Sequence, residues 1–246
     1  MRSLRCAVVY LMVWCASPAL AADTDFDVQF NGCSEYVGIG YVPFANARAL
    51  VPSHYALATG AGGNAFIVVR ATSCNAVTVA GASPQPARTA QVGIMLAGQD
   101  PSADINNYLL WFLTDSSQLS AKMQAIGVEP GVVQLLTLAF TPILGSGPLA
   151  LNVTAVVSAS YTVIGQASTP TAAPVAFVAN WFSDGAQGSV RMHTEFPAIH
   201  FGAASTLLTP TPATPIAPLV GSATLRFAVL DSYNSWNAAS MQSRLQ

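Results

Sequence analysis

The sequence predicts a mainly β protein with a single domain, and three observations support this prediction. Of the 246 residues, 52% are hydrophobic and only 8% are charged, so the chain can bury a large core. An average soluble domain is about a quarter charged, so this chain lacks the usual material for long, solvated helix faces. Runs of β-branched and aromatic residues, bounded by Gly, Pro, Asn or Ser, recur along its whole length.

The N-terminus predicts a signal peptide over residues 1–21. Two arginines lie in Met1–Arg5, an uncharged apolar stretch covers 6–16, and Ala19-Leu20-Ala21 supplies the small residues that a signal peptidase requires. The alternative is a membrane anchor, but this stretch has about half of the roughly 20 apolar residues needed to span hydrocarbon. We therefore expect cleavage after about Ala21, a secreted or periplasmic protein, and a single β-rich domain over 22–246.

Removal of this peptide leaves two cysteines, Cys33 and Cys74. In an oxidising compartment a single remaining pair is expected to form a disulfide. The alternative is two free, buried thiols.

About eleven segments have the composition of strands. The alternation of apolar and polar residues in Leu151–Ser158 is typical of a strand with one buried face, whereas Phe66–Val69 is apolar on both faces. In chain order the expected strands are Tyr36–Val42, Ala65–Ala71, Ala76–Ala80, Ala90–Ala97, Asn107–Leu113, Val132–Thr141, Leu149–Ile164, Val175–Phe182, Ser189–Phe196, Ile199–Leu208 and Ala223–Leu230.

One short helix is expected at about 115–126. Asp115 can cap its N-terminus, an apolar stripe follows at helical spacing, and Gly127 can end it. A second, weaker helical pattern lies in Asn234–Leu245. The tract Thr209–Pro218 contains four prolines, which cannot donate to a β-ladder, so we expect an extended loop there.

The densest polar cluster lies in Ser183–Glu195. On a strand, the two-residue period places Arg191, His193 and Glu195 on one face. They form a candidate ligand-binding or acid/base site, with Arg191 as a carboxylate clamp and His193 and Glu195 as a proton-transfer pair. The alternative is a solvated strand face whose charges compensate each other. Trp111 and Trp181 are either core residues or part of a cavity wall.

Other functional classes find little support in the sequence. The net charge of -2 provides no cationic excess for nucleic acid. Gly60–Ala65 fits a glycine-rich dinucleotide pattern, but a strand follows it and no acidic residue lies about 20 residues further on, so it predicts a turn. His193 and Glu195 on a strand could supply two ligands of a metal site, but no short spacing supplies a third from His200 or His54. We predict no metal, no cofactor and no stable membrane insertion.

Several short motifs together resemble the acetoacetate decarboxylase-like superfamily. They are Leu50-Val51-Pro52, the strand Asn107–Phe112 followed by a short helix, Gly127-Val128-Glu129-Pro130, and Asn180-Trp181-Phe182 with Gly185 and Gly188. The resemblance covers about residues 36–230. It implies a twisted β-barrel, or cone-like sheet, around a largely apolar internal cavity.

The same resemblance implies that a catalytic group is missing. Members with decarboxylase activity have a lysine directly after the proline that corresponds to Pro130. This lysine forms a Schiff base with the substrate, because an imine accepts the electrons of the departing carbon dioxide. Gly131 occupies the matching position, and the only lysine of the chain is Lys122, on the predicted helix.

The sequence therefore leaves three functions open. The first is an exported, non-catalytic protein that binds a small hydrophobic or carboxylate-bearing ligand in a β-lined cavity. The second is an enzyme that uses Arg191, His193 and Glu195 on a small acid. The third is a structural or surface-interaction protein.

Overall fold

The computed structural model describes residues 25–246 except 129, 133–135, 143–149, 158–159 and 186–187. The predicted signal peptide lies outside the described residues. The strands are β1 (Phe26–Val42), β2 (Ala65–Val79), β3 (Gln85–Met95), β4 (Ile105–Thr114), β5 (Pro130–Val132), β6 (Leu136–Pro142), β7 (Ala150–Val157), β8 (Tyr161–Ser168), β9 (Val175–Gly185), β10 (Gly188–Pro210), β11 (Leu225–Arg226) and β12 (Leu230–Leu245). The helices are α1 (Phe44–Arg48), α2 (Ser117–Ala125) and α3 (Ile216–Val220), with a 3-10 turn at Ala61–Gly63.

The prediction of a mainly β, barrel-like protein is confirmed. The strands follow the order β12-β1-β2-β3-β4-β9-β10, and β10 also pairs with β12, which closes them into a ring. Most neighbours are antiparallel, but β4 and β9 run parallel. Closure removes free edges from this part of the sheet, so its backbone groups are paired around the whole circumference.

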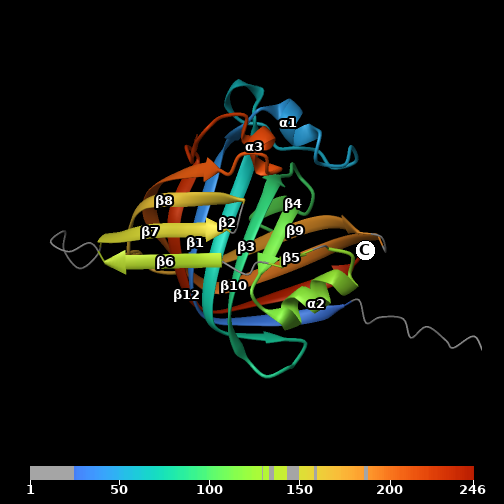
Figure 1. Cartoon of the computed structure of the whole chain (residues 1–246). Coiled ribbons are helices and arrows are strands. Elements are labelled where there is room, and N and C mark those ends of the chain that lie inside the picture. Colours follow the sequence, from blue (N-terminus) through green and yellow to red (C-terminus); the bar gives the residue numbers. More distant parts are fainter. Residues whose placement is uncertain (1–24, 129, 133–135, 143–149, 158–159, 186–187) are drawn as a thin grey trace, which may run out of the picture.

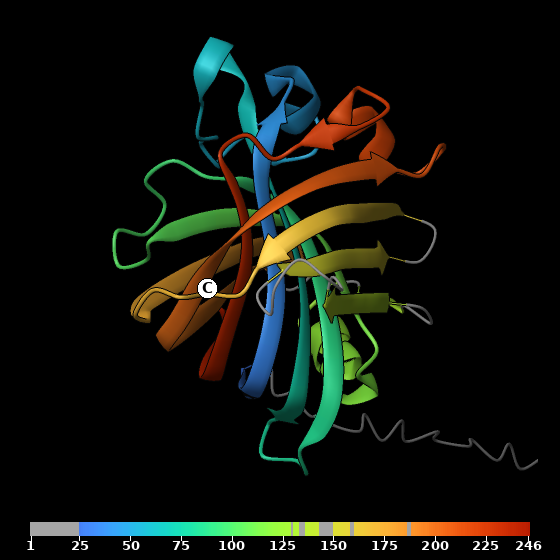
Figure 2. The same cartoon turned by 90° about the vertical axis from the view of Figure 1, so that its left-hand side faces the viewer.

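Strand β10 extends beyond the ring and joins it to a second layer. Its first part pairs with β9 and β12, and its last residues, Ala204–Pro210, pair with β8. Strands β8, β7 and β6 then run across the outside of the ring, near β2 and β3 (Figures 1 and 2). Helices α1 and α3 lie together at one end, and α2 lies on the other side of the molecule (Figure 1).

Two hydrophobic cores fill the two sides of the ring sheet. One, between the ring and β8, includes Tyr36, Val69 and Tyr161. The other, inside the ring and under α2, includes Val68, Trp181 and residues of the helix itself. Consecutive residues Val68 and Val69 therefore belong to opposite cores, which is why the sequence around them is apolar at every position.

The predicted α-helix is present, but its capping residue differs from the prediction. It covers Ser117–Ala125, and the Ser116 hydroxyl accepts the N–H of Leu119, 3.2 Å away. The Asp115 carboxylate instead accepts the N–H of Arg88, 2.7 Å away. Either oxygen could cap a helix, and the neighbouring strand β3 decides which one does.

Three other predictions of secondary structure are corrected. Two helices, α1 and α3, were not expected because five residues are too few to produce a helical pattern. Helix α3 also overlaps the end of the proline-rich tract, so 209–218 is not entirely a loop. The weak helical pattern in Asn234–Leu245 is part of strand β12, whose hydrogen bonds to both β1 and β10 override the local pattern.

The structure confirms two local predictions. Cys33 and Cys74 form a disulfide and are direct cross-strand partners on β1 and β2. The glycine-rich segment Gly60–Ala65 is a turn that leads directly into β2, with Gly62 and Gly63 at positive φ.

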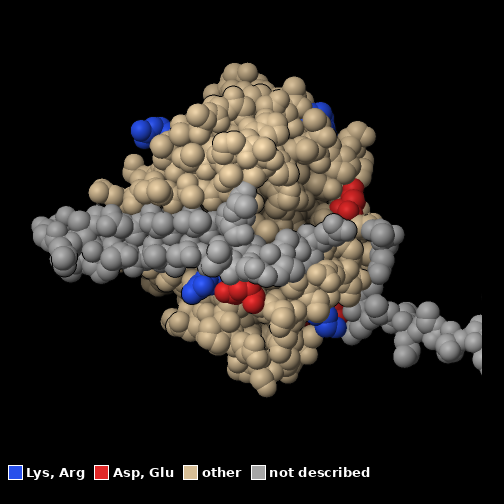
Figure 3. Space-filling model, viewed as in Figure 1, with Lys and Arg blue, Asp and Glu red and all other residues tan. Residues whose placement is uncertain are grey.

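Few charged side chains interrupt the surface seen in Figure 3, in keeping with the composition.

Candidate functional site

A cavity of about 480 Å³ lies inside the ring of strands. Each strand of the ring contributes to its wall, and the loop between β3 and β4 contributes to one side. The lining residues are Glu35, Val37, Ile39, Val68, Arg70, Met95, Leu96, Gly98, Asp100, Pro101, Ala103, Asp104, Ile105, Asn106, Asn107, Phe177, Ala179, Trp181, Phe196, Ile199, Phe201, Leu230 and Asn234. Most of these side chains are apolar or aromatic, as is usual for sites that hold small molecules.

Gly93 makes room for the largest of these side chains. A Cβ atom at this position would lie 2.7 Å from Cζ3 of Trp181 and 2.4 Å from the carbonyl oxygen of Tyr108. Both distances are shorter than van der Waals contact. Only glycine therefore lets strand β3 approach the indole that forms this part of the wall.

A buried carboxylate, that of Glu35, interrupts the apolar wall. Its side chain is only 3% exposed. Oε1 accepts hydrogen bonds from Nε of Arg70 and from the hydroxyl of Thr72, the latter at 2.9 Å. Oε2 accepts from Nδ2 of Asn234 at 3.2 Å. A buried charge requires such compensation, and here three neighbouring side chains provide it.

Arg70 is the counter-ion of Glu35 and is itself held from several sides. Besides the bond to Glu35, its Nη1 donates to Oε1 of Gln91, 2.9 Å away. The guanidinium carbon lies 5.5 Å from the ring centre of Phe196 and 5.9 Å from that of Trp236, within the range of cation–π interactions. The Arg70 side chain keeps 13% of its surface exposed.

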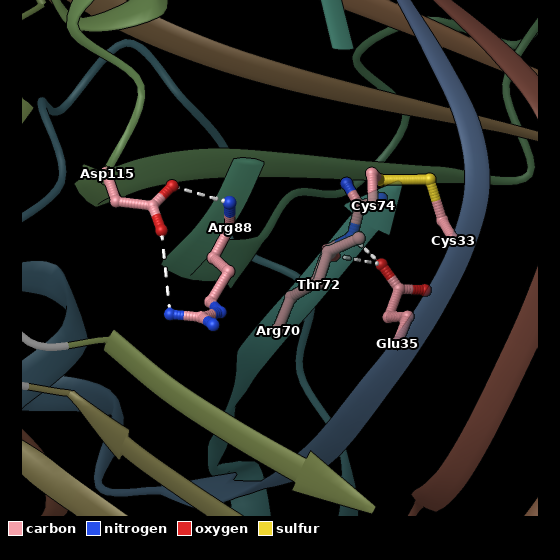
Figure 4. The surroundings of a disulfide bond; sticks show 7 residues. All are labelled: Cys33, Glu35, Arg70, Thr72, Cys74, Arg88 and Asp115. Carbon is pink, nitrogen blue, oxygen red and sulfur yellow. Dashed lines mark hydrogen bonds and ion pairs between the residues drawn. A yellow bond between two sulfur atoms is a disulfide. The ribbon is translucent and has the colours of Figure 1, made fainter. Parts of the chain in front are cut away.

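Strand register explains why these groups meet. Cys33 lies opposite Cys74, so two residues further along β1 Glu35 lies opposite Thr72, and Val37 lies opposite Arg70. Figure 4 shows the disulfide beside Glu35, Thr72 and Arg70. On the other sides, Asn234 is the partner of Glu35 on β12, and Gln91 is the partner of Arg70 on β3. The polar groups therefore form one belt across four neighbouring strands.

The loop between β3 and β4 is held in place by Asp100. Its Oδ1 accepts from the backbone N–H and the hydroxyl of Ser102, at 2.9 and 2.7 Å. Its Oδ2 accepts from Nη1 of Arg191 at 2.9 Å and from Nδ2 of Asn180 at 3.1 Å. The bonds from Ser102, together with Arg191, lower the pKa of Asp100 from 3.8 to about 2.

Arg191, His193 and Glu195 share one face of β10, while Val190, Met192 and Thr194, which alternate with them, are buried. His193 contacts Asn180 through Nδ1 at 2.8 Å and Glu195 through Nε2 at 3.2 Å. None of the three belongs to the cavity wall. Arg191 is nevertheless connected to the cavity through Asp100, and a direct role of the three in ligand binding stays a prediction.

The two tryptophans singled out from the sequence lie in different places. Trp181 is 2% exposed and lines the cavity. Trp111 lines a separate hollow beside α2, together with Tyr108 and Asp184. Lys122 lies on α2 and is not part of the cavity wall. Gly131 lies in β5, where its partner on β4 is Leu113.

Glu35 and Arg70, the central pair of the site, were missed from the sequence, although two signals could have indicated them. Arg70 is a lone charge at the end of the apolar run Phe66–Val69, in a chain where charge is rare. The predicted disulfide would also have fixed the register, because antiparallel strands with Cys33 opposite Cys74 bring Glu35 next to Thr72.

Two features, a metal-binding cluster and a membrane-spanning helix, are not found in the part of the chain that the structure describes. It contains no group of three or more His, Cys, Asp or Glu side chains that could hold a metal ion. It also contains no helix long and apolar enough to cross a membrane.

Several solved structures share this fold. An acetoacetate decarboxylase superposes with a TM-score of 0.58 at 9% sequence identity, over 89% of this chain and 88% of the other. The acetoacetate decarboxylase of Legionella pneumophila gives 0.54 at 10% identity, over 87% and 84%. An acetoacetate decarboxylase-like enzyme from Sphingomonas wittichii gives 0.53 at 13% identity, over 92% and 94%.

No protein-family model and no curated protein sequence matches the chain. The enduracididine biosynthesis enzyme MppR, in complex with pyruvate, also superposes, with a TM-score of 0.52 at 10% identity, over 90% of each chain. The chain therefore has the acetoacetate decarboxylase-like fold, as the sequence resemblance implied. Identities this low establish the fold alone.

Proposed function

We propose that this chain is an exported, non-catalytic protein that binds a small, largely apolar ligand inside the ring of strands. One observation carries the proposal: a cavity of about 480 Å³ whose wall is mostly apolar and whose buried carboxylate is already paired. Ligand sites combine apolar walls with a few placed polar groups. Glu35, Arg70 and Asn234, which belong to both the polar belt and the cavity wall, supply those polar groups here.

The volume of the cavity limits the size of the ligand. About 480 Å³ lies within the usual range of 300–1,000 Å³ for sites that bind small molecules. The aromatic side chains Phe177, Trp181, Phe196 and Phe201 offer large contact areas at little entropic cost. A linear or monocyclic molecule with one polar end would fit this combination of volume and wall.

Export is supported by two features of different kinds. The Cys33–Cys74 disulfide fits an oxidising compartment. The first 21 residues have the charge, apolar stretch and small residues of a signal peptide.

The absence of catalysis is proposed from the position of the lysine. The one primary amine among the side chains belongs to Lys122, which is not in the cavity wall. Schiff-base catalysis needs an amine in contact with the substrate.

A fluorescence assay with the mature protein tests the binding function. N-phenyl-1-naphthylamine, a neutral apolar dye, should bind and brighten, and short-chain alcohols and ketones should displace it. Native mass spectrometry of the same mixtures gives the stoichiometry, for which we expect one molecule per chain. Dye that neither brightens nor associates with the chain would refute the proposal.

A pair of matched variants locates the binding. Ala179 lines the cavity, whereas Ala203 is exposed on the neighbouring strand β10. Ala179→Leu adds three carbons to the cavity and should weaken dye binding at least tenfold, while Ala203→Leu should leave it within twofold. Thermal unfolding shows whether both variants fold. If Ala179→Leu does not fold, Val37→Leu, another enlargement of a lining residue, replaces it. Equal effects of the two substitutions would mean that the dye binds elsewhere.

A further inference from the structure

We infer that the cavity selects a neutral ligand, whose ketone, ester, amide or hydroxyl oxygen accepts a hydrogen bond from Arg70, and that it rejects carboxylates. This inference rests on the proposed binding function and narrows its ligand class. It follows from the charge of the cavity wall and from the bonds that Arg70 already makes.

The charge of Arg70 is already compensated. Its Nε donates to Glu35, and Glu35 is 3% exposed in the same wall. A ligand carboxylate at this position would make two carboxylates share one guanidinium, with an uncompensated negative charge in a mostly apolar space. Water solvates a carboxylate far better than such a site does, so binding would be strongly opposed.

The rest of the wall adds negative charge. Besides Glu35, the acidic residues Asp100 and Asp104 line the cavity, and Arg70 is the only basic residue among the lining residues that the structure describes. Arg191, outside the wall, pairs with Asp100 at 2.9 Å and compensates its charge, so the net negative charge comes from Asp104, for which the described residues supply no ion-pair partner. The local field therefore disfavours an anion even before it reaches Arg70.

A neutral oxygen avoids both penalties. Among the described residues, Glu35 and Gln91 accept from Nε and Nη1 of Arg70, and the side chain keeps 13% of its surface exposed. A guanidinium has five N–H groups, so donors remain for an uncharged acceptor that enters the cavity. The bond would be charge-assisted on the donor side and would leave the Glu35–Arg70 pair intact. The apolar remainder of the ligand would lie against the aromatic wall.

Octanoate and 2-nonanone form a suitable pair of probes, because they differ only by a carboxylate oxygen in place of a methyl group. Displacement of N-phenyl-1-naphthylamine at pH 7.5 should give a Kd for 2-nonanone at least tenfold below that for octanoate, and octanamide should behave like the ketone. Octanoate that binds as tightly as the ketone, or more tightly, would overturn the inference. Dye that binds while neither ligand displaces it would also overturn it.

The pH dependence of the affinity for octanoate tests the same inference on the unmodified protein. Octanoic acid becomes neutral as the pH falls through the usual range of carboxyl pKa values, at about 4 to 5. Its affinity should rise toward that of the ketone between pH 7 and pH 4, while the ketone's affinity stays within twofold. If the affinity for octanoate decreases as the pH is lowered from 7 to 4, the inference is contradicted.

Two substitutions test which charges are responsible. Glu35→Gln releases Arg70 from its counter-ion and should shift the preference at least tenfold toward octanoate. Asp104→Asn is a second, milder change at the edge of the cavity, which keeps the test decisive if Glu35→Gln does not fold, and it should improve octanoate binding about twofold to threefold. Asp115→Asn changes a carboxylate that does not line the cavity, so it is the control and should change neither Kd. An unchanged preference in both wall variants would refute the role of the wall charge.

The proposed function and this inference fail in different ways. If no dye and no ligand binds, the cavity is not a binding site. If both ligands bind and the carboxylate is preferred, the binding function stands and the selection against anions is wrong.

Discussion

Arg70 on β2 donates diagonally to Glu35 on the neighbouring strand β1, although its direct partner in the strand register is Val37. The diagonal contact leaves Thr72, the direct partner of Glu35, free to donate to the same carboxylate at 2.9 Å. Gln91 fixes the other side of the guanidinium. One buried ion pair is thus oriented by three strands before any ligand arrives.

Removing one member of this pair should destabilise the protein strongly. Arg70→Met leaves the 3% exposed Glu35 without its counter-ion, and a broken buried pair typically costs about 3–5 kcal/mol of unfolding free energy. Urea denaturation measures this loss. Arg226→Met removes an exposed arginine on β11 and is the control, expected within about 0.5 kcal/mol of the wild type. If the two variants are equally stable, the pair is not a structural requirement.

The disulfide should contribute substantially to stability. Cys33 and Cys74 are separated by 41 positions, and in the chain-entropy model closing a loop of this length stabilises the folded state by about 4 kcal/mol. The double variant Cys33→Ser/Cys74→Ser should lower the urea midpoint accordingly. Because the same bond fixes the register beside Glu35, the variant should also weaken dye binding. A variant with unchanged midpoint and dye affinity would contradict both expectations.

Asp100 should make stability depend on acid pH. Its folded pKa is lowered from 3.8 to about 2 by hydrogen bonds from Ser102 and Arg191. A carboxyl with a lowered folded pKa stabilises the protein above its unfolded pKa, and the contribution disappears as the pH falls through the folded value. The difference in unfolding free energy between the wild type and Asp100→Asn should therefore be constant above about pH 5 and shrink from pH 4 to pH 2. A difference that stays constant down to pH 2 would show that this carboxyl is not stabilised in its charged form.

Keto acids should not form a Schiff base with this chain. Lys122 is its only lysine, and it lies on α2 rather than in the cavity wall. Treatment with pyruvate and sodium borohydride should therefore leave the intact mass unchanged at neutral pH, apart from slow labelling of the terminal amine. A stoichiometric adduct on Lys122 would contradict the proposed absence of catalysis.

Substitution of His193 should leave ligand binding intact. Its ring contacts Asn180 and Glu195, and it does not line the cavity. We expect His193→Ala to keep the Kd of the dye within twofold, whereas Phe196→Ala, which removes an aromatic wall residue, should raise it at least fivefold. A larger effect of His193→Ala than of Phe196→Ala would restore the polar face of β10 as the binding site.

For strands that are buried on both faces, the sequence predicted where a strand lies but not where it begins and ends. The predicted strands Ala65–Ala71 and Ala76–Ala80 are one strand, β2, because pairing with β1 on one side and β3 on the other continues through the polar residues between them. Strand β12 was not expected at all, since its apolar residues alternate weakly. Hydrogen bonding to two neighbours outweighs local preference in such segments.

Composition, cysteine number and turn residues were enough to predict the mainly β class, the pairing of Cys33 with Cys74, the helix near 117–125 and the turn before β2, because these signals act locally. The folded chain was needed to show that Glu35 and Arg70 meet in the wall of a cavity while Arg191, His193 and Glu195 lie outside it. This difference arises from closure of the ring. A two-residue period states which residues share a face, but only the register and curvature of the closed sheet decide which face is the inside.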